Sequence, residues 1–482
     1  MIDLRPVLFV CGILIATLGI LMSLPSVVDA ATGHPDWQAF ALSALLTLFV
    51  GGGLALTNRM ERYRMNLRQA FFMTALCWLM AAVFGALPLA FSRVGLSYTD
   101  AFFEAMSGIT TTGSTVIGGL DRAPRGLLLW RALLQWLGGI GIVVTAFAVL
   151  PMLRVGGMQL FRTEGAEAQE QLLPRAATQI TGIGIAYVGT TVAIGIALWL
   201  AGMTGFDAIV HAMTSISTGG FSTHDRSIGF YDVAPIEWIL IVAMILGSLP
   251  FIYYVDALRG RPGPMIQDSQ VQWFIGIVVL CVVLTALWLG TTLGLPAERA
   301  VTLASFHVVS FMTGAGFFVG DFNAWGALPL VILVGLMFVG GCAGSTTSGI
   351  KVFRFQVAFQ VAKVQIARLL QPHGVFLPYF NRRPIADEVA ITVIGFFFAY
   401  VLCFIVLALA LGLLGLDLLT ALTGAAAAIA NVGPGIGDAI GPASGFGALP
   451  DAAKWLLAAG MLLGRLELFT VLVLFMPSFW RG

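Results

Sequence analysis

The sequence carries very little charge for its length. Only 10% of its 482 residues are charged, while 59% are apolar and the mean hydropathy is +0.94. An ordinary soluble domain contains about 25% charged residues, so this composition excludes that class and predicts an integral membrane protein. The net charge of +1 and the lack of long basic or acidic runs give no indication of nucleic-acid binding. At about 20 residues per span, the chain has room for roughly ten transmembrane helices.

Cysteines and catalytic motifs are also scarce. The five cysteines lie mostly in apolar stretches without CxxC spacing, and we interpret them as small packing residues. The sequence contains no HExxH or GxSxG motif and no pair of carboxylates within one span. An enzyme would need a convergent nucleophile, metal site or acid pair. The sequence therefore predicts that the chain is not an enzyme and that it uses no organic cofactor.

Two apolar runs open the chain, at about residues 7–24 and 40–56. The first run is longer than the core of about 7 to 15 residues in a secretory signal, so we interpret it as a span, although small residues near Ala30 offer a possible cleavage point. A basic turn follows at Arg59, Arg62 and Arg64, which the positive-inside rule assigns to the cytoplasm. Residues 1–69 are expected to form an N-terminal two-helix segment.

Four short polar segments with glycine interrupt the remaining apolar sequence. They are residues 110–113 (TTTG), 217–220 (STGG), 313–316 (TGAG) and 431–433 (NVG). Each follows a long apolar stretch and a short helical stretch, and each precedes a second long apolar stretch. This order predicts four repeats, at 70–153, 154–260, 261–384 and 385–482. The expected fold is all-α, with the two N-terminal helices followed by four pseudo-fourfold repeats of helix, pore loop and helix around one ion pathway.

The first two repeats align without gaps. Residues 100–113 (DAFFEAMSGITTTG) lie on residues 207–220 (DAIVHAMTSISTGG), which makes Gly113 equivalent to Gly220. Gly316 and Gly433 are the counterparts in the more divergent third and fourth repeats. Acidic residues near the start of the short helices are expected to cap them, since the helix dipole favours carboxylates there. These residues are Asp100, Asp207, Glu298 and Asp417.

The four segments have the chemistry of an ion pore. Irregular backbone at membrane depth is tolerated only where protein buries it or where it lines a water-filled cavity. If the segments converge on one axis, their carbonyl oxygens can replace the hydration shell of a potassium ion. Glycine permits the backbone conformations that turn successive carbonyls inward. Close helix packing is the alternative role for a single membrane glycine, but four copies at equivalent positions favour a pore.

The second long helix of the third repeat contains a polar, glycine-rich stretch at residues 340–349 (GGCAGSTTSG). We expect it to form a loop inside the membrane just below the filter, where flexible glycines and hydroxyl donors suit a gate. The alternative is a tight packing face between helices. The residues assigned to this gate are Gly340, Gly341, Gly344, Ser345 and Gly349.

A single arginine, Arg465, lies within the last long apolar helix, which is expected to run from 453 to 476. An arginine inside the bilayer normally faces a cavity or a partner, while snorkelling to the interface is the alternative. Glu467 lies two residues further on, so the two side chains point to different sides of a helix and need not pair.

Basic residues are distributed unequally between the two sides of the predicted membrane. The side of the first basic turn also holds Arg154, Arg162, Arg175, Arg259, Arg261, Lys351, Arg354, Lys363, Arg368, Arg382 and Arg383. The opposite side holds fewer, among them Arg131, Arg299 and Lys454. This bias predicts cytoplasmic termini, with the filter loops entering from outside. The basic face either docks a cytosolic partner or only fixes the topology.

The motifs together carry a family resemblance. The most specific segments are residues 100–116, 219–225 (GGFSTHD), 340–345 (GGCAGS), 431–435 (NVGPG) and 464–467 (GRLE). Over essentially its whole length the chain resembles the Trk/Ktr/HKT superfamily of potassium transporters, and within it the bacterial TrkH/TrkG subunits. The resemblance implies potassium uptake across the bacterial inner membrane, with Rb⁺ also accepted. It also implies a homodimer and a cytosolic TrkA-like nucleotide-binding regulatory subunit.

The resemblance further implies which residues meet the ion and which gate it. The coordinating carbonyls would come from Thr111, Thr112, Thr218, Gly219, Gly314, Ala315, Asn431 and Val432, each pair preceding its filter glycine, Gly113, Gly220, Gly316 or Gly433. Arg465 would reach the glycine-rich loop and present a positive barrier. The third loop departs from the family pattern, because no second hydroxyl residue precedes Ala315. We therefore expect only moderate discrimination of K⁺ from Na⁺.

Two other transport mechanisms stay open on this sequence. One is a proton- or sodium-coupled potassium symporter of the same fold, and the other is a secondary transporter of another fold with broken helices. Fluxes that saturate and depend strictly on a second ion would favour coupling, whereas single-channel openings would favour a pore.

Overall fold

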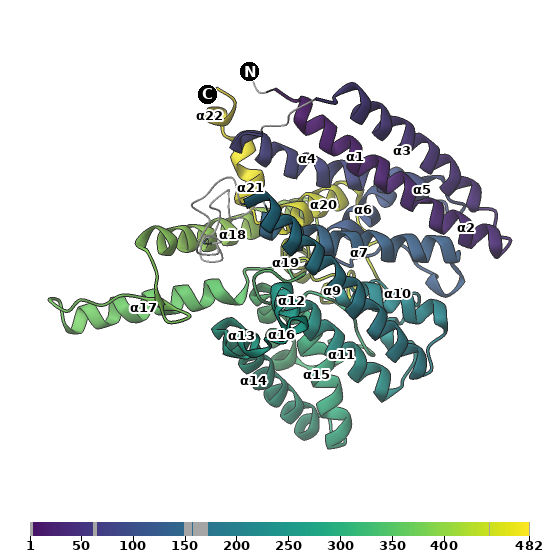
Figure 1. Cartoon of the computed structure of the whole chain (residues 1–482). Helices are drawn as coiled ribbons and strands as arrows, with labels where there is room; N and C mark the ends of the chain where they lie inside the picture. The colour runs from purple at the N-terminus through teal and green to yellow at the C-terminus, as the bar shows by residue number, and fades with distance from the viewer. Residues whose placement is uncertain (1–2, 61–64, 149–156, 158–171, 443, 482) are drawn as a thin grey trace.

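The computed structural model describes residues 3–60, 65–148, 157, 172–442 and 444–481, with the side chains of 147–148 and 172–178 left aside. Arg62, Arg64, Arg154 and Arg162, and the expected boundary between the first two repeats at 153/154, lie outside the described residues. The described chain is almost entirely helical (Figure 1). The expected all-α membrane fold is confirmed.

The N-terminal segment is a helical pair in which small residues permit close contact. The first member of the pair is formed by α1 (Arg5–Leu21) and α2 (Ser23–Ala31), which together make one candidate span, and the second member is α3 (Trp37–Thr57). A Cβ atom on Gly12 would lie 2.8 Å from the carbonyl oxygen of Gly51, and one on Gly51 would lie 2.4 Å from the amide nitrogen of Ala16. Without glycine at these positions the two helices could not approach so closely.

Each repeat consists of a long helix, a short pore helix and a second apolar segment. The first contains α4 (Leu67–Gly85), α5 (Leu87–Phe91), the pore helix α6 (Tyr98–Ile109), η1 (Leu120–Arg122) and α7 (Arg125–Ala148). The second contains α9 (Leu172–Leu200), the pore helix α10 (Gly205–Ile216), η3 (Ser227–Phe230), α11 (Ala234–Ser248) and α12 (Phe251–Leu258).

The third and fourth repeats follow the same order. The third contains α13 (Gly263–Gln267), α14 (Ser269–Thr292), the pore helix α15 (Ala297–Thr313), η4 (Phe322–Trp325), α16 (Ala327–Val339), α17 (Val352–Leu370), and the short antiparallel strands β1 (Tyr379–Phe380) and β2 (Arg383–Pro384). The fourth contains α18 (Asp387–Leu413), the pore helix α19 (Leu418–Ala430), α20 (Asp451–Arg465), α21 (Phe469–Leu472), η5 (Val473–Phe475) and α22 (Pro477–Trp480).

The second long apolar stretches of the second and fourth repeats, residues 235–258 and 453–476, were each expected to form a single helix, but both are sharply bent, so that prediction is wrong. The second repeat bends by 97° between α11 and α12, where Pro250 provides no amide proton to continue the helix. The fourth bends by 108° between α20 and α21. In the third repeat, the expected interruption between α16 and α17 is confirmed. Among the described residues, seven helices are long and apolar enough to span a membrane, or nine if each bent pair counts as one span.

Three of the four pore helices begin with side-chain caps, but two of these caps are not the expected aspartates. The helix α15 begins after Pro296 without a side-chain cap, so Glu298 lies in its first turn and does not cap it as expected. Ser97 and Thr204 cap α6 and α10, and each accepts a hydrogen bond from the amide of an aspartate three residues later, Asp100 or Asp207. Those aspartates lie in the first turn, where they still benefit from the helix dipole. Asp417 caps α19 as expected, accepting from the Thr420 amide at 3.1 Å.

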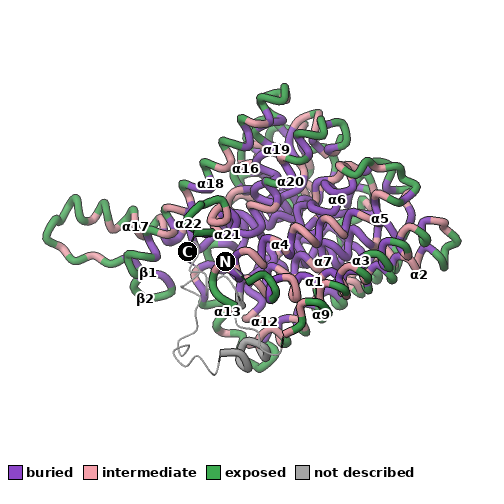
Figure 2. Tube along the Cα trace, turned by 90° about the horizontal axis from the view of Figure 1, so that it is seen from above, coloured by how far each residue is buried: buried purple, intermediate pink, exposed green. Residues whose placement is uncertain are grey.

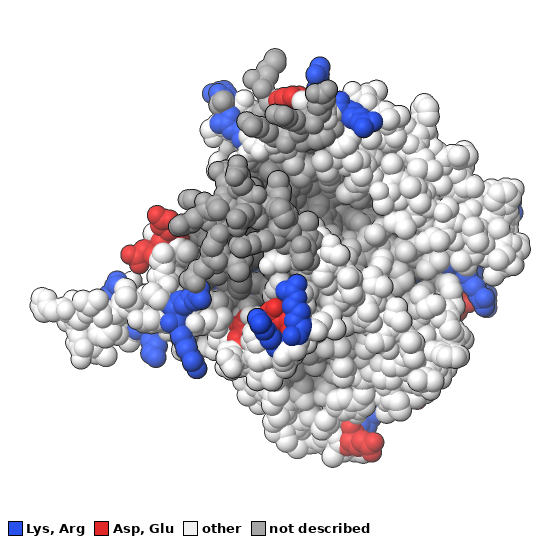
Figure 3. Space-filling view, viewed as in Figure 1, with Lys and Arg blue, Asp and Glu red and all other residues white. Residues whose placement is uncertain are grey.

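Burial decreases from the centre outward (Figure 2). The four pore helices and the segments after them are buried. The helix α17 begins with buried residues and then projects from the body, where residues 359–370 are mostly exposed. The surface in Figure 3 is mostly uncharged, and much of the apolar surface is exposed on long helices such as α14 and α18. A lipid-facing exterior and a polar interior are expected when polar backbone must be kept away from hydrocarbon.

Candidate functional site

The four filter segments share one backbone conformation. Left-handed φ angles occur twice in each, first one or two residues after the pore helix ends and again two residues later. The first set is Thr111 (53°), Thr218 (53°), Gly314 (78°) and Asn431 (54°), and the second set is Gly113 (86°), Gly220 (75°), Gly316 (72°) and Gly433 (95°). This pattern supports the register used for the divergent third and fourth repeats. A β-branched threonine at positive φ is rare and strained, and such strain persists where the surroundings impose it.

The four segments form a closed ring. At each filter glycine, a Cβ atom would overlap the carbonyl oxygen of the residue before the filter glycine of the next repeat. The distances are 2.1 Å from Gly113 to Gly219, 1.6 Å from Gly220 to Ala315, 2.0 Å from Gly316 to Val432 and 2.8 Å from Gly433 back to Thr112. No side chain fits at the glycine positions. The ring thus brings together the carbonyls of Thr112, Gly219, Ala315 and Val432, four of the eight residues expected to meet the ion.

Hydrogen bonds between neighbouring repeats hold the ring. Ser114 donates its hydroxyl to the Gly433 carbonyl at 2.7 Å, and Asn431 donates from Nδ2 to Oγ1 of Thr112 at 2.8 Å. These bonds join the first and fourth repeats. Asn431 therefore belongs to the ring and also connects the first and fourth repeats through its side chain.

The segments that follow the filter are fixed by side chains of the pore helices. The carboxylate of Glu104 accepts from the Val116 amide at 2.9 Å, Nε2 of His307 faces the Val319 amide at 3.3 Å, and Oγ1 of Thr423 accepts from the Ile436 amide at 3.1 Å. In each case the amide belongs to the third residue after the filter glycine. In the second repeat, His211 instead contacts the Ser222 hydroxyl at 3.0 Å. We had not assigned these side chains to the site, because their role depends on contacts with irregular backbone.

Glu104 also forms a buried ion pair with Arg131 on α7. Nε of Arg131 lies 2.7 Å from Oε1 of Glu104, and its Nη1 donates to the Ser222 carbonyl at 3.0 Å. Both charged side chains are almost completely buried. Arg131 was counted above among the residues of the outer side, and its structural role is to connect the first and second filter segments.

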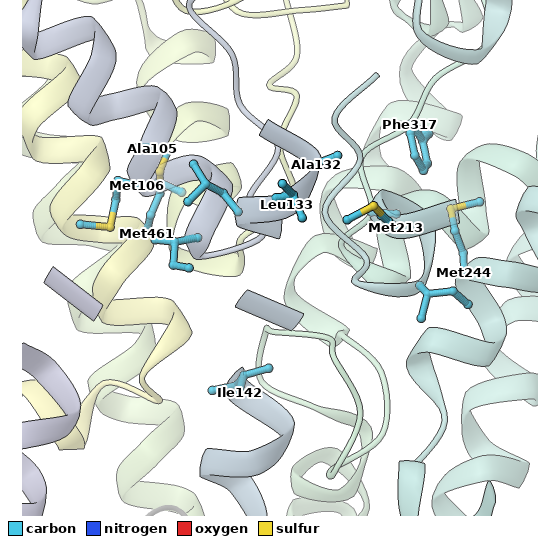
Figure 4. Close-up of a cluster of buried hydrophobic side chains, with 14 of the residues drawn as sticks. Ala105, Met106, Ala132, Leu133, Ile142, Met213, Met244, Phe317 and Met461 are labelled. Carbon is cyan, nitrogen blue, oxygen red and sulfur yellow. The ribbon is translucent and has the colours of Figure 1, made fainter. Parts of the chain in front are cut away.

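Outside the ring lies a cavity of about 290 Å³. Its lining includes Gly113, Gly220, Gly316, His224 and Asp225. Three of the four ring glycines line this cavity, so the cavity borders the ring. Buried apolar side chains form a hydrophobic cluster between the repeats (Figure 4). They include Met106, Met213, Met244 and Met461.

The glycine-rich loop of residues 340–349 is buried beneath the second filter segment. Oγ1 of Thr346 lies within hydrogen-bond distance of two carbonyl oxygens, those of Ile216 at 3.0 Å and Gly247 at 2.9 Å, at the ends of α10 and α11. Its single proton is shared between these two acceptors. The Cys342 amide donates to the Ser248 carbonyl at 3.1 Å. The backbone amides of the interrupted third repeat are thus partly satisfied by the end of α11, where the second repeat bends into α12.

Arg465 contacts this loop directly. Its Nη1 donates to the Thr346 carbonyl and the Ser348 hydroxyl, both at 2.8 Å, and its Nη2 donates to the Gly138 carbonyl on α7 at 3.0 Å. The side chain is 1% exposed and forms no ion pair within the described part of the chain. Among the gate residues expected from sequence, the structure brings Arg465 to residues 346–348 of the loop.

Glu467 pairs elsewhere, as its position relative to Arg465 suggested. It contacts Nζ of Lys351 at 2.8 Å and also the guanidinium of Arg354. Lys351 and Arg354 are 2% and 0% exposed. These two residues therefore cannot belong to a basic face that docks a partner, because both charges lie inside the protein next to Glu467.

Comparison with known proteins identifies the family. The model of the TrkH family, described as a cation transport protein, matches residues 36–481. The chain belongs to the TrkH family. It is 43% identical to the Trk system potassium uptake protein TrkI of Halomonas elongata over 99% of this chain and 97% of that one, and 38% identical to Escherichia coli TrkH over 99% of both.

The same conclusion holds at the level of structure. The crystal structure of the potassium transporter TrkH from Vibrio parahaemolyticus superposes with a TM-score of 0.92, at 36% sequence identity and full coverage of both chains. The expectation of a Trk-family membrane transporter rather than an enzyme is confirmed.

Proposed function

We propose that this TrkH-family protein takes up potassium across the bacterial inner membrane through the ring formed by the four filter segments. The observation that carries the proposal is the closed contact of each filter glycine with a carbonyl of the next repeat. Backbone carbonyls in a ring can replace the hydration shell of an ion. The printed names of the relatives, which are potassium uptake proteins, support K⁺ as the transported ion. Rb⁺, which is close to K⁺ in size, would be accepted as well.

Gly113→Ser tests the filter. A Cβ at Gly113 would overlap the Gly219 carbonyl, and φ of 86° disfavours any side chain there. We expect a lower ratio of Rb⁺ to Na⁺ flux into liposomes. Gly189→Ser on α9, where a Cβ meets nothing within 4 Å, is the matched control. Equal ratios in wild type and Gly113→Ser would show that the ring is not the filter.

We also propose that residues 340–349 and Arg465 form the gate. The buried loop lies against the end of α10, next to the second filter segment, and Arg465 joins it to α7. A fixed positive charge at this place raises the barrier for a cation. Uncoupled conduction through this gate would appear as single-channel openings, whereas strict dependence on a proton or sodium gradient would support the symporter.

A cytosolic TrkA-like subunit is proposed to act on this gate through α17, which continues directly from the loop. Lys363, Arg368, Arg382 and Arg383 are exposed on α17 and the following strands. Homodimer formation and cytoplasmic termini are proposed on the family resemblance and on the charge bias. Light scattering of the detergent-solubilised protein, with the detergent mass subtracted, tests the dimer.

A further inference from the structure

The amide of Gln135 holds the second filter segment on both sides of its filter glycine. Nε2 of Gln135 donates to the Gly219 carbonyl at 2.6 Å, and its Oε1 accepts from the Phe221 amide at 3.0 Å. The side chain is 0% exposed. Since one partner can only accept and the other can only donate, the orientation of the amide group is fixed.

The same position is apolar in the other three repeats. Gln135 lies three residues before Gly138, and methionines lie three residues before the corresponding glycines: Met244 before Gly247, Met337 before Gly340 and Met461 before Gly464. The correspondence is structural for three of these glycines. A Cβ would lie 1.8 Å from the Ile109 carbonyl at Gly138, 2.6 Å from the Ile216 carbonyl at Gly247 and 1.9 Å from the Ile429 carbonyl at Gly464. Each of these carbonyls precedes its filter glycine by four residues.

Gln135 is matched to a second exception in the same repeat. The residue before the filter glycine is Gly219 in the second repeat, whereas it is Thr112, Ala315 or Val432 in the others. A Cβ on Gly219 would lie 2.4 Å from Cδ of Gln135. The amide group therefore occupies the space that a side chain at this position would need.

The bond to Gly219 changes what this carbonyl can offer an ion. A carbonyl oxygen has two lone pairs, and the Gln135 amide uses one of them. The Gly219 carbonyl is thus held in place but binds an ion less strongly than a free carbonyl. The field inside the ring becomes unequal, and ion selectivity depends on the number and field strength of the coordinating carbonyls.

We propose that Gln135 is a specificity-determining positioning residue, which sets the direction and strength of the Gly219 carbonyl in the filter ring. The proposal rests on the proposed function of that ring. Gln135 acts through the backbone of residues 219–221 and does not itself touch the ion.

Gln135→Met gives this position the side chain that the other three repeats carry. We expect the Rb⁺ to Na⁺ flux ratio in liposomes to change by about two- to tenfold, the range that corresponds to the loss of one or two hydrogen bonds. Met244→Leu is the matched control, because it alters packing at the corresponding position without any filter hydrogen bond. If Gln135→Met does not fold, Gln135→Leu, which also lacks both polar groups, replaces it.

Three results would overturn the proposal, and they separate it from the proposed function. A ratio unchanged in Gln135→Met but altered in Gly113→Ser would remove Gln135 and leave the filter in place. An equal change in Gln135→Met and Met244→Leu would reduce Gln135 to a packing residue. Unchanged ratios in both Gln135→Met and Gly113→Ser would refute the filter itself.

Discussion

The guanidinium of Arg465 donates to the carbonyl oxygen of Thr346 at 2.8 Å, across 119 residues of sequence. This bond connects the end of α20 to the break between α16 and α17. Placing an arginine side chain at membrane depth costs at least about 2.5 to 3.5 kcal/mol of free energy. Here the guanidinium donates its hydrogen bonds to neutral acceptors. Its positive charge is therefore not cancelled by a direct ion pair in the described part of the chain.

Removing this charge should open the pathway. We expect Arg465→Ala to raise Rb⁺ flux in liposomes without a regulatory subunit by roughly tenfold or more. The reason is that the electrostatic repulsion between a unit charge near the pathway and a passing cation is large enough to change the flux by about that factor. The Rb⁺ to Na⁺ ratio should stay the same. Arg465→Lys keeps the charge but loses the fork of donors, so it separates the barrier from the loop anchor. A folded Arg465→Ala with wild-type flux would remove Arg465 from the gate.

Glu467 should matter for stability more than for selectivity. Glu467→Gln leaves Lys351 and Arg354 buried without their shared counter-charge. Loss of one partner from a buried ion pair typically destabilises by about 3–5 kcal/mol. A clear decrease in the melting temperature of the detergent-solubilised protein is expected. Glu298→Gln, at an exposed site on α15, is the control, and equal melting temperatures for the two variants would contradict this account.

His224 should give the outer cavity a pH-dependent contribution to stability. Burial alone would lower the pKa of His224, but contacts with Asp207 and Asp121 outweigh it and raise the pKa above 6.5. The neighbouring His211 and Asp225 also bear on this site. Because the folded pKa is raised, the stabilisation is fully present below about pH 6.5 and is lost as pH rises through the raised pKa.

The test is a pair of melting curves at pH 6.0 and pH 8.5, values chosen on either side of this transition. Wild type should lose more stability on going to the higher pH than His224→Gln does. His373→Gln, at an exposed position on the far segment after α17, should behave as wild type. Identical pH dependence in His224→Gln and wild type would show that His224 is not the group responsible.

Charge reversal at Arg382 and Arg383 should weaken binding of a TrkA-like subunit. Both residues are exposed near β2, so the double change to glutamate leaves the buried core intact. The loss should be largest at low salt, where interactions between surface charges are least screened. Pull-down of the partner at increasing salt measures it. Undiminished capture by the double variant at low salt would exclude this surface.

Sequence alone was sufficient for the membrane class and for the equivalence of the glycine-containing loops. Composition excluded a soluble domain, and the gap-free match of residues 100–113 with 207–220 placed Gly113 and Gly220 in equivalent loops. The polar stretch at 340–349 predicted a helix break, because consecutive glycines and hydroxyls cannot continue an apolar span. These inferences depend on local composition and period, which the chain carries in every environment.

The partners of the charged and amide side chains were determined only by the tertiary structure. Glu467 and Leu468 adopt positive φ angles of 57° and 52°, so the helix ends at Arg465 although no proline marks the break. Pairing of Glu467 with Lys351 and Arg354, more than 110 residues earlier, accompanies that turn. In the sequence, Gln135 is only one polar residue in an apolar helix. The fold places its amide group in hydrogen-bond contact with the Gly219 carbonyl. Such partners are separated widely in sequence, and their contact energy depends on burial that no local pattern encodes.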